Sequence, residues 1–352
     1  MTTRERVQRM LAHKEADRVP ITDGPWDGTI NRWIREGMPQ DVDWRDYFDV
    51  DKFEAISVDI SPQYEQKVLE DNDVFTVFTT SYGITMKQLK GKDTTPEYLD
   101  ITISDPGKWA EAKARINHNP DRVDWAGLKK NFPKWDAEGR WVEGIFKFGF
   151  DVTHAKITGT ETLLIAMLEE PEWVEDMFHT MLDANIALFD MIWDKGYHFD
   201  GILFYEDMGF KQNQFFSLDI YRKLVKPAHK RAIEWADNRG IPTRLHSCGM
   251  IEPFLPDLLE MGLAALNPLE VKAGMDPIKI KWLYGDKLTL HGGINAILWD
   301  KPDEVKAEIE RLVPVLKENG GYIFSSDHSI PSSVSLEDFR QIVALVKEVG
   351  AY

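Results

Sequence analysis

The stretch "RLHSCGM" (residues 244–250) contains the only cysteine of the chain, and His246 precedes Cys248 by two positions. On a β-strand this spacing puts both side chains on one face, because strand side chains alternate. Imidazole nitrogen and thiolate sulfur are both good zinc ligands, and a catalytic zinc commonly takes three protein ligands. The pair indicates a zinc site that needs one more ligand, the alternative being that Cys248 is a small buried hydrophobic residue.

Titratable residues also follow the neighbouring predicted strands. Because the carboxyl ends of parallel strands meet at one mouth of a barrel, residues far apart in the sequence can share a site. For the third zinc ligand we favour His328, followed by Glu206 and Glu270. For Glu270, a structural salt bridge with Lys272 is the alternative.

Other strand-end residues are candidates for acid–base or binding roles. Asp207 adjoins Glu206, and two adjacent carboxylates at a strand end favour a function. His291, in "LHGGIN", either faces the same mouth or merely ends a strand. His154 and Asp151 follow the third predicted strand and could face this mouth too. We assign no role to the histidines in apparent helices, turns and loops: His13, His118, His179, His198 and His229.

Short apolar runs alternate with helical patterns, as they do in parallel α/β folds. Eight runs predict strands, and eight strands close a (β/α)8 TIM barrel. They cover residues 18–23, 53–60, 141–150, 201–207, 243–248, 265–270, 288–293 and 322–327. Helices are predicted over residues 2–13, 171–196, 217–240 with a kink at Pro227, 301–321 and 335–350.

Residues 61–140 do not follow this alternation. The runs "VFTVFTTSYGITMKQLK" and "PEYLDITIS" predict antiparallel hairpin strands with Gly83 near a turn. We therefore expect one barrel domain over residues 1–352, with a β-hairpin insertion in its N-terminal half, near the second loop.

The composition limits the partners. With 42 basic and 59 acidic residues the formal net charge is -17, which would repel nucleic acid, so a small molecule or a protein is expected instead. No apolar run is long enough to span a membrane, and neither a disulfide nor a signal region is indicated. The cytoplasm is the expected location.

Several segments together resemble the uroporphyrinogen decarboxylase superfamily of (β/α)8 barrels. The likeness covers nearly the whole chain and is weakest over residues 61–140. It rests on "TTRERVQRMLAHKEADRVPI", "GILFYEDMG", "FSLDIYRKLVKPAHKR", "RLHSCGMIEPFLPDLLEMGLAALNPLEVKAGMD", "LTLHGGIN" and "GGYIFSSDHSIPSSVSLEDF".

Two departures narrow what the resemblance implies. Uroporphyrinogen decarboxylases carry an Arg-Gln-Ala-Gly-Arg-Tyr-like stretch that holds substrate propionates, whereas this chain reads "DGPWDGTINRWIREG" there. The thiol-methylating relatives bind zinc through His-x-Cys and a later cysteine, which is absent here. Asp327 and His328 stand about where that cysteine would fall, and a site with one sulfur ligand suits an oxygen ligand better than a thiol.

The resemblance then implies a zinc-dependent methyltransferase of the corrinoid-dependent branch. It would move a methyl group from a small donor, such as a methoxylated aromatic, to the cobalt of a corrinoid (cobalamin) on a partner protein, in an O-demethylation. The roles implied are zinc ligation by His246, Cys248 and His328, completion of the metal shell by Glu206 or Glu270, orientation or protonation of the leaving oxygen by Asp207 or His291, and stacking by Trp26 and Tyr205.

Three alternatives remain: a methylcorrinoid:thiol methyltransferase, a uroporphyrinogen decarboxylase-like decarboxylase, and a barrel that binds a corrinoid without turnover. The sequence names neither the donor nor the oligomeric state, for which a homodimer is one option.

Overall fold

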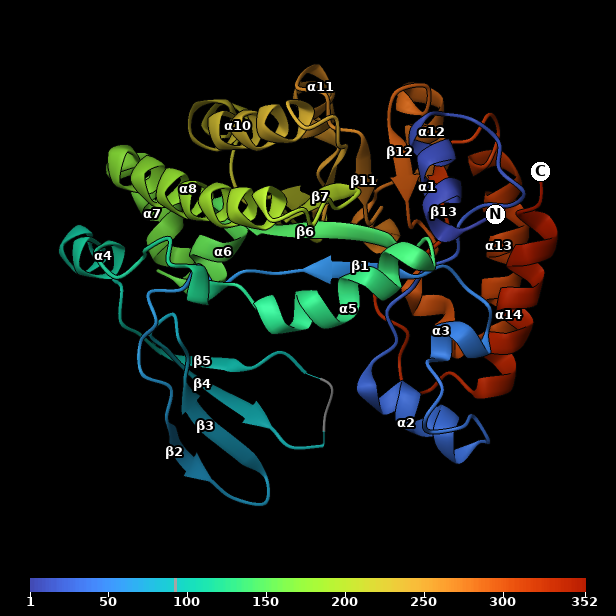
Figure 1. Cartoon of the computed structure of the whole chain (residues 1–352), viewed down its shortest axis with the longest axis horizontal. Coiled ribbons are helices and arrows are strands. Elements are labelled where there is room, and N and C mark those ends of the chain that lie inside the picture. The colour runs from blue at the N-terminus through green and yellow to red at the C-terminus, as the bar shows by residue number, and fades with distance from the viewer. Residues whose placement is uncertain (92–93) are drawn as a thin grey trace.

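The computed structural model describes residues 1–91 and 94–352 and contains a curled sheet of seven parallel strands (Figure 1). The strand order is the order of the chain. The strands are β1 (Phe53–Ile56), β6 (Trp141–Lys147), β7 (Gly201–Tyr205), β10 (Thr243–His246), β11 (Ala265–Asn267), β12 (Thr289–His291) and β13 (Tyr322–Ile323). The expectation of an α/β barrel of the TIM type is confirmed.

The eighth expected strand, over residues 18–23, is not a regular strand. It nevertheless stands beside β13, because Phe324 N donates to Pro20 O (2.9 Å) and Thr22 N donates to Phe324 O (3.0 Å). On its other side Asp51 N donates to Ile21 O (2.9 Å), while the Asp51 carboxylate accepts from Ile21 N (2.8 Å). Since Pro20 has no N–H and a side chain takes that of Ile21, no regular ladder can form toward β1.

Helices pack around the sheet and follow most of its strands. They are α1 (Thr3–Leu11), α2 (Asp27–Arg35), α3 (Trp44–Tyr47), α4 (Pro106–Lys113), α5 (Trp125–Ala137), α6 (Gly149–Lys156), α7 (Thr160–Glu169), α8 (Pro171–Asp194), α9 (Leu218–Ile220), α10 (Lys226–Asp237), α11 (Leu255–Glu260), α12 (Pro277–Tyr284), α13 (Pro302–Leu316) and α14 (Leu336–Val349).

Local sequence signals explain several helix boundaries. Thr2 and Glu5 form a reciprocal capping box at the start of α1, and Pro171 occupies the first turn of α8. Between α9 and α10 the helix widens into a π-helical stretch over Tyr221–Val225, which ends two residues before Pro227, where a kink was expected. No helix in the described ranges is long and apolar enough to cross a membrane.

The insertion lies between β1 and β6 and forms a separate antiparallel sheet of four strands, seen below the barrel in Figure 1. They are β2 (Val68–Asp71), β3 (Phe75–Thr79), β4 (Ile84–Leu89) and β5 (Glu97–Ile101), and Gly83 stands in the turn before β4 with φ +85°. The antiparallel pairing is as expected. A further short hairpin, β8 (Gly209–Phe210) with β9 (Asn213–Gln214), follows β7.

Candidate metal centre

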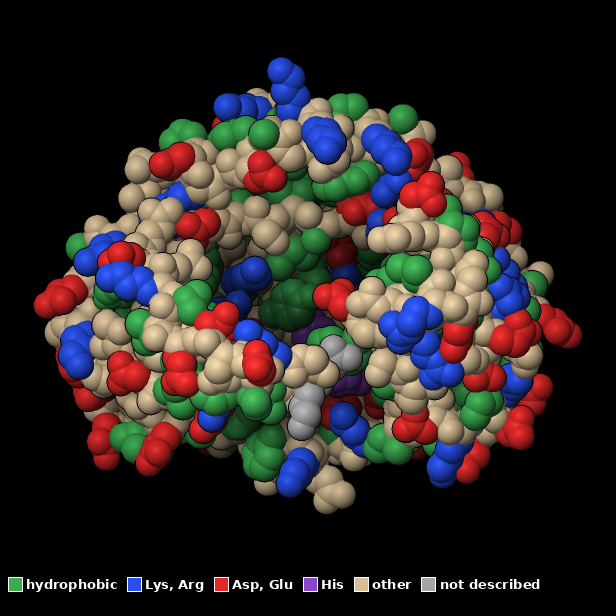
Figure 2. All heavy atoms as spheres, turned by 90° about the horizontal axis from the view of Figure 1, so that it is seen from below, with side chains coloured by type: hydrophobic (Ala, Val, Ile, Leu, Met, Phe, Trp, Pro, Cys, Tyr) green, Lys and Arg blue, Asp and Glu red, His purple; other side chains and the backbone are tan. Residues whose placement is uncertain are grey.

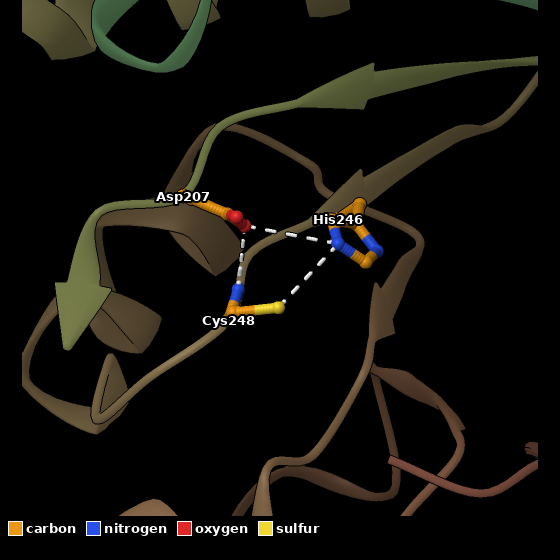
Figure 3. Close-up of side chains that lie close together, drawn as sticks. All are labelled: Asp207, His246 and Cys248. Atoms are coloured by element: carbon orange, nitrogen blue, oxygen red, sulfur yellow. Dashed lines mark hydrogen bonds and ion pairs between the residues drawn. The ribbon is translucent and has the colours of Figure 1, made fainter. Parts of the chain in front are cut away.

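Asp207, His246 and Cys248 come together at the carboxyl ends of β7 and β10 (Figure 3). Each offers one ligand atom, and these atoms lie within 4.8 Å of one another. His246 Nε2 lies 3.6 Å from Cys248 Sγ and 3.7 Å from Asp207 Oδ1. Nitrogen, sulfur and oxygen donors in one group fit zinc, which is held by these three atom types in proteins.

Asn267, on the neighbouring strand β11, determines which ring nitrogen of His246 carries the proton. His246 Nδ1 lies 2.8 Å from Asn267 Oδ1, and Asn267 Nδ2 donates to the carbonyl oxygen of His291 (3.3 Å). Because this places the amide oxygen of Asn267 toward the ring, Nδ1 carries the proton and donates it. Nε2 therefore presents its lone pair to Cys248 and Asp207, as a metal ligand must.

Burial shifts the pKa of both other side chains of the group upward. Desolvation, together with the carboxylates of Asp207 and Glu270, raises the pKa of the Cys248 thiol. Burial also raises the pKa of Asp207, against an opposing effect of His246. Cys248 N donates to Asp207 Oδ1 (2.8 Å), which fixes the carboxylate beside the thiol. A divalent cation would bind Cys248 as the thiolate, so that metal binding would release the thiol proton.

The group opens on a cavity of about 440 Å³ at the mouth of the barrel. Figure 2 shows this face hollowed near its centre, with histidine and Lys or Arg side chains inside. The side chains that line the cavity include Asp23, Trp26, Tyr205, Asp207, Arg244, His246, Cys248, Asn267, His291, Asp327 and His328. A cavity of this volume fits a small organic molecule.

His328 lines this cavity, but the three-residue group contains Asp207 in the place for which the sequence favoured His328. The His328 ring lies 6.3 Å from that of Trp26, which is 38% exposed. Tyr205, also 38% exposed, has its ring 4.8 Å from that of His246. Trp26 and Tyr205 thus present ring surface to the cavity, where a substrate could stack.

Glu206 and Glu270 bind backbone N–H groups rather than the metal group. Glu206 is fully buried and accepts from Phe150 N (2.8 Å) and Asp151 N (3.1 Å), with His229 Nε2 3.2 Å away. Glu270 accepts from Gly249 N (2.6 Å), directly after Cys248. Glu206 therefore ties the end of β7, directly before Asp207, to the start of α6, and Glu270 fixes the loop that follows Cys248.

Glu270 also has the ionic contact that the sequence suggested as its alternative role, because Lys272 Nζ lies 3.4 Å from its Oε1. His154 lies apart from the metal cavity. Its ring stacks on Phe150 at 4.7 Å, and Nδ1 lies 3.1 Å from Thr160 Oγ1.

His291 lies on the inner side of the barrel and is held neutral. Arg244 Nη1 lies 3.0 Å from His291 Nδ1 and must be the donor, so the ring proton resides on Nε2. Burial and the charge of Arg244 lower the pKa of His291 well below its ordinary value. Arg244 in turn pairs with Glu143 (Nε to Oε1, 3.0 Å). A neutral His291 can donate a hydrogen bond but is a poor source of a proton.

Sequence reasoning missed three residues that shape the site: Asn267, Arg244 and His229. Arg244 could have been found by the period of two that relates it to His246 on one strand. Asn267 ends the next strand in "ALNPLE", so its position was available, although its partner was not. His229 gave no signal, because it lies within a helix and contacts Glu206 only through the fold.

Comparison with known proteins identifies the family and finds a structural likeness that covers nearly the whole chain. The family model described as uroporphyrinogen decarboxylase (URO-D) matches residues 152–349, more than half of the chain. The uroporphyrinogen decarboxylase of Pelodictyon phaeoclathratiforme is 27% identical over 143 residues, which are 38% of this chain and 39% of that protein. The match thus spans about two fifths of that relative's length.

A methyltransferase from Methanosarcina mazei has a TM-score of 0.67 at 15% identity, with 99% of each chain covered. At this identity the likeness shows a common fold.

Proposed function

This chain belongs to the uroporphyrinogen decarboxylase family, and we propose that within it the protein is a metal-dependent methyltransferase. The proposed reaction moves a methyl group from a small O-methyl donor to the cobalt of a corrinoid on a separate protein. The observation that carries the proposal is the group of Asp207, His246 and Cys248 at a cavity of about 440 Å³. The full-length likeness to a solved methyltransferase supports it.

In this reaction the methyl–oxygen bond of the donor breaks and a bond from the methyl carbon to reduced cobalt forms. The cobalt supplies the electron pair of the new bond, and the donor oxygen leaves with the pair of the old one and takes a proton from water. A zinc ion held by Asp207, His246 and Cys248 would act as a Lewis acid on that oxygen and make it a better leaving group.

The chain's own residues would hold the donor in place. Tyr205 and Trp26 offer ring faces on which a methoxylated aromatic could stack. His291 is neutral and carries its proton on Nε2, so it can donate a hydrogen bond to the substrate that supplies the methyl group. Asn267 keeps the lone pair of His246 Nε2 directed at the metal group.

Because the chain is similar to a uroporphyrinogen decarboxylase, decarboxylation of a porphyrinogen is the second candidate function. An octa-anionic tetrapyrrole needs several free cationic side chains. Arg244, the arginine that lines the metal cavity, already pairs with Glu143 and is therefore not free to bind a substrate carboxylate. Thiol methylation fits the ligand set less well, because one sulfur and one carboxylate give a less electron-rich metal than two sulfurs.

Metal analysis of purified protein tests the ligand set. We expect about one zinc per chain, lost in Cys248→Ala and in Asp207→Ala but kept in His328→Ala, a matched change in the same cavity. If zinc were lost in His328→Ala and kept in Asp207→Ala, the third ligand would be His328 and not Asp207. Fully active protein without metal would contradict the metal mechanism.

Methyl transfer is tested by the absorbance change of a reduced corrinoid protein mixed with methoxylated aromatics. Wild type should methylate the cobalt, and Cys248→Ala should be slower by a factor of about 100 or more. Carbon dioxide released from a porphyrinogen, with no cobalt methylation across the donors, would favour the decarboxylase.

A further inference from the structure

A second cavity, of about 360 Å³, shares Tyr205 with the metal cavity. β6 contributes Lys147 to its lining, and α6 contributes Asp151 and Lys156. The charged side chains of this cavity are thus two ammonium groups and one carboxylate. Its lining has a net positive charge in a chain whose formal charge is -17.

Lys147 stands at the same level of the barrel as the metal group. It pairs in register with Tyr205 on β7, and Tyr205 pairs with His246 on β10. Glu143 on the same strand bonds Arg244 inside the barrel, and the period of two places Lys147 on that inner face. Adjacent strands lie about 4.8 Å apart, so about 10 Å separates the backbones of Lys147 and His246.

Within the described ranges, no carboxylate lies at ion-pair distance from the ammonium group of Lys147 or Lys156. Lys156 Nζ instead lies 5.7 Å from the centroid of the Tyr82 ring. Burial and the nearby charge of Lys156 lower the pKa of Lys147. Partly buried charges are normally paired, so two unpaired ammonium groups facing one cavity favour binding of an anion there.

The acidic side chains nearby have other contacts. Asp151 Oδ1 lies 3.6 Å from His154 Nε2, on the next turn of α6. Asp59 accepts from Ser61 Oγ (2.6 Å) and Gln63 Nε2 (2.9 Å). Burial and Lys156 lower the pKa of Lys147, and the charges of Asp151 and Asp59 oppose this shift. Neither carboxylate forms an ion pair with Lys147 or Lys156.

We propose that Lys147 and Lys156 form a subsite for the carboxylate of the methyl donor, an inference that rests on the proposed function. The donor's ring would lie along Tyr205, whose ring is 4.8 Å from that of His246, with its methoxy group at the metal group. The strand spacing between Lys147 and His246 is comparable with the length of a benzene ring that carries a methoxy group at one end and a carboxylate at the other. The protein would therefore favour carboxylate-bearing donors over neutral ones.

Equilibrium binding to the purified, zinc-loaded protein tests this subsite without any methyl transfer. The probes are 4-methoxybenzoate and 4-methoxybenzyl alcohol, which differ in the charged group alone. Wild type should bind the acid more tightly, and Lys147→Met or Lys156→Met should weaken acid binding about tenfold or more while leaving the alcohol unchanged. Lys147→Arg should restore acid binding.

Lys230→Met, on the exposed face of α10, is the matched control and should bind both probes as wild type does. Lys147→Met should melt at or above the temperature of wild type, because a partly buried unpaired ammonium group disfavours folding. Loss of acid binding is then a property of the subsite and not of unfolding.

Three results would overturn the subsite: equal binding of the two probes by wild type, no acid binding by wild type, or unchanged acid binding by both Met variants. Inorganic phosphate that binds more tightly than the acid, through the same lysines, would overturn the assignment to a carboxylate. If the lysines carry acid binding but no donor methylates a corrinoid, the proposed function falls and the subsite stands. If neutral donors methylate the corrinoid rapidly and both Met variants do so at the rate of wild type, the proposed function stands and the subsite falls.

Discussion

The chemistry of His246 depends on one hydrogen bond that its ring donates to Asn267, a residue outside the three-residue metal group. Asn267 Oδ1 lies 2.8 Å from Nδ1, and the Asn267 amide is itself oriented by its bond to the His291 carbonyl. This chain of contacts holds the ring in the tautomer that leaves Nε2 free. Outer partners of this kind commonly change metal affinity by a factor of about 10 to 100.

Asn267→Leu should therefore weaken zinc binding by a factor of about 10 or more. The leucine removes the acceptor for His246 Nδ1, so the ring can rotate or place its proton on Nε2. Competition with a chelator of known affinity measures the effect without an activity assay. Asn267→Asp keeps an acceptor and should bind zinc nearly as wild type does, whereas equal affinities for all three proteins would refute this role.

At this scale the sequence predicted His246 and Cys248 as ligands because both follow from one local pattern, a period of two on one strand. Asp207 was predicted to orient or protonate the leaving oxygen, whereas the structure places it in the group that could hold the metal. The position of Asp207 beside Cys248 depends on how the chain turns after β7, and that geometry has no local signature. Asn267 depends on the register between β10 and β11, which a sequence pattern does not contain.

At the scale of elements, the start of α6 is joined to β7 and α10 by buried polar contacts. Glu206 follows β7 and accepts from the first N–H groups of α6, while His229 of α10 lies 3.2 Å from the same carboxylate. Gly149, the first residue of α6, has φ +77°, and a Cβ added there would lie 2.3 Å from Glu206 Oε1. Only a residue without a side chain fits between the strand end and the helix.

Gly149→Ala should lower the free energy of unfolding by about 3 kcal/mol, from left-handed strain and from the clash with Glu206. Gly196→Ala is the matched control, because Gly196 has φ +87° and nothing within 4 Å of an added Cβ. It should cost about 1 kcal/mol, the backbone strain alone. Denaturant unfolding compares the two, and equal losses would show that the contact with Glu206 is unimportant.

Seven of the expected strands formed, each at a short run that contains apolar or β-branched residues and stands between helical or polar segments. The exception, residues 18–23, has the same kind of run but contains Pro20 and borrows the Asp51 side chain as a hydrogen-bond partner. That partner lies 30 positions from Ile21 and could not be inferred locally. In the insertion, the antiparallel pairing was predictable from alternation and turns, but its four-stranded extent was less clear.

At the scale of the whole molecule, the ring is closed by contacts between the first and last parts of the chain. Asp23 accepts from both Ser326 N and Ser326 Oγ, each at 2.9 Å. Trp26 N donates to Ile330 O (3.2 Å), and Val19 N donates to Gly350 O (2.9 Å). Burial raises the pKa of Asp23 to about 6, against the hydrogen bonds that favour its charged form.

This shift gives stability a defined pH dependence. A carboxyl whose folded pKa is raised from 3.8 to about 6 contributes stability that is fully present below pH 3.8 and is lost as the pH rises through about 6. Relative to Asp23→Asn, wild type should lose on the order of 2 kcal/mol between about pH 4 and about pH 7. Urea unfolding of both proteins across this range measures the difference, and a constant or rising difference would contradict the prediction.

The contacts that close the ring also have a consequence for biosynthesis. Asp23 and Ser326 are 303 positions apart, so the ribosome makes one long before the other. A chain that emerges in order can assemble β6 to β12 strand by strand. Residues 18–24 can meet Asp51 early, but they lack their partners at Phe324, Ser326 and Ile330 until those residues have been made. This early segment is then among the last to complete its hydrogen bonds, and its exposed groups are a site where the nascent chain is open to chaperones or to premature pairing.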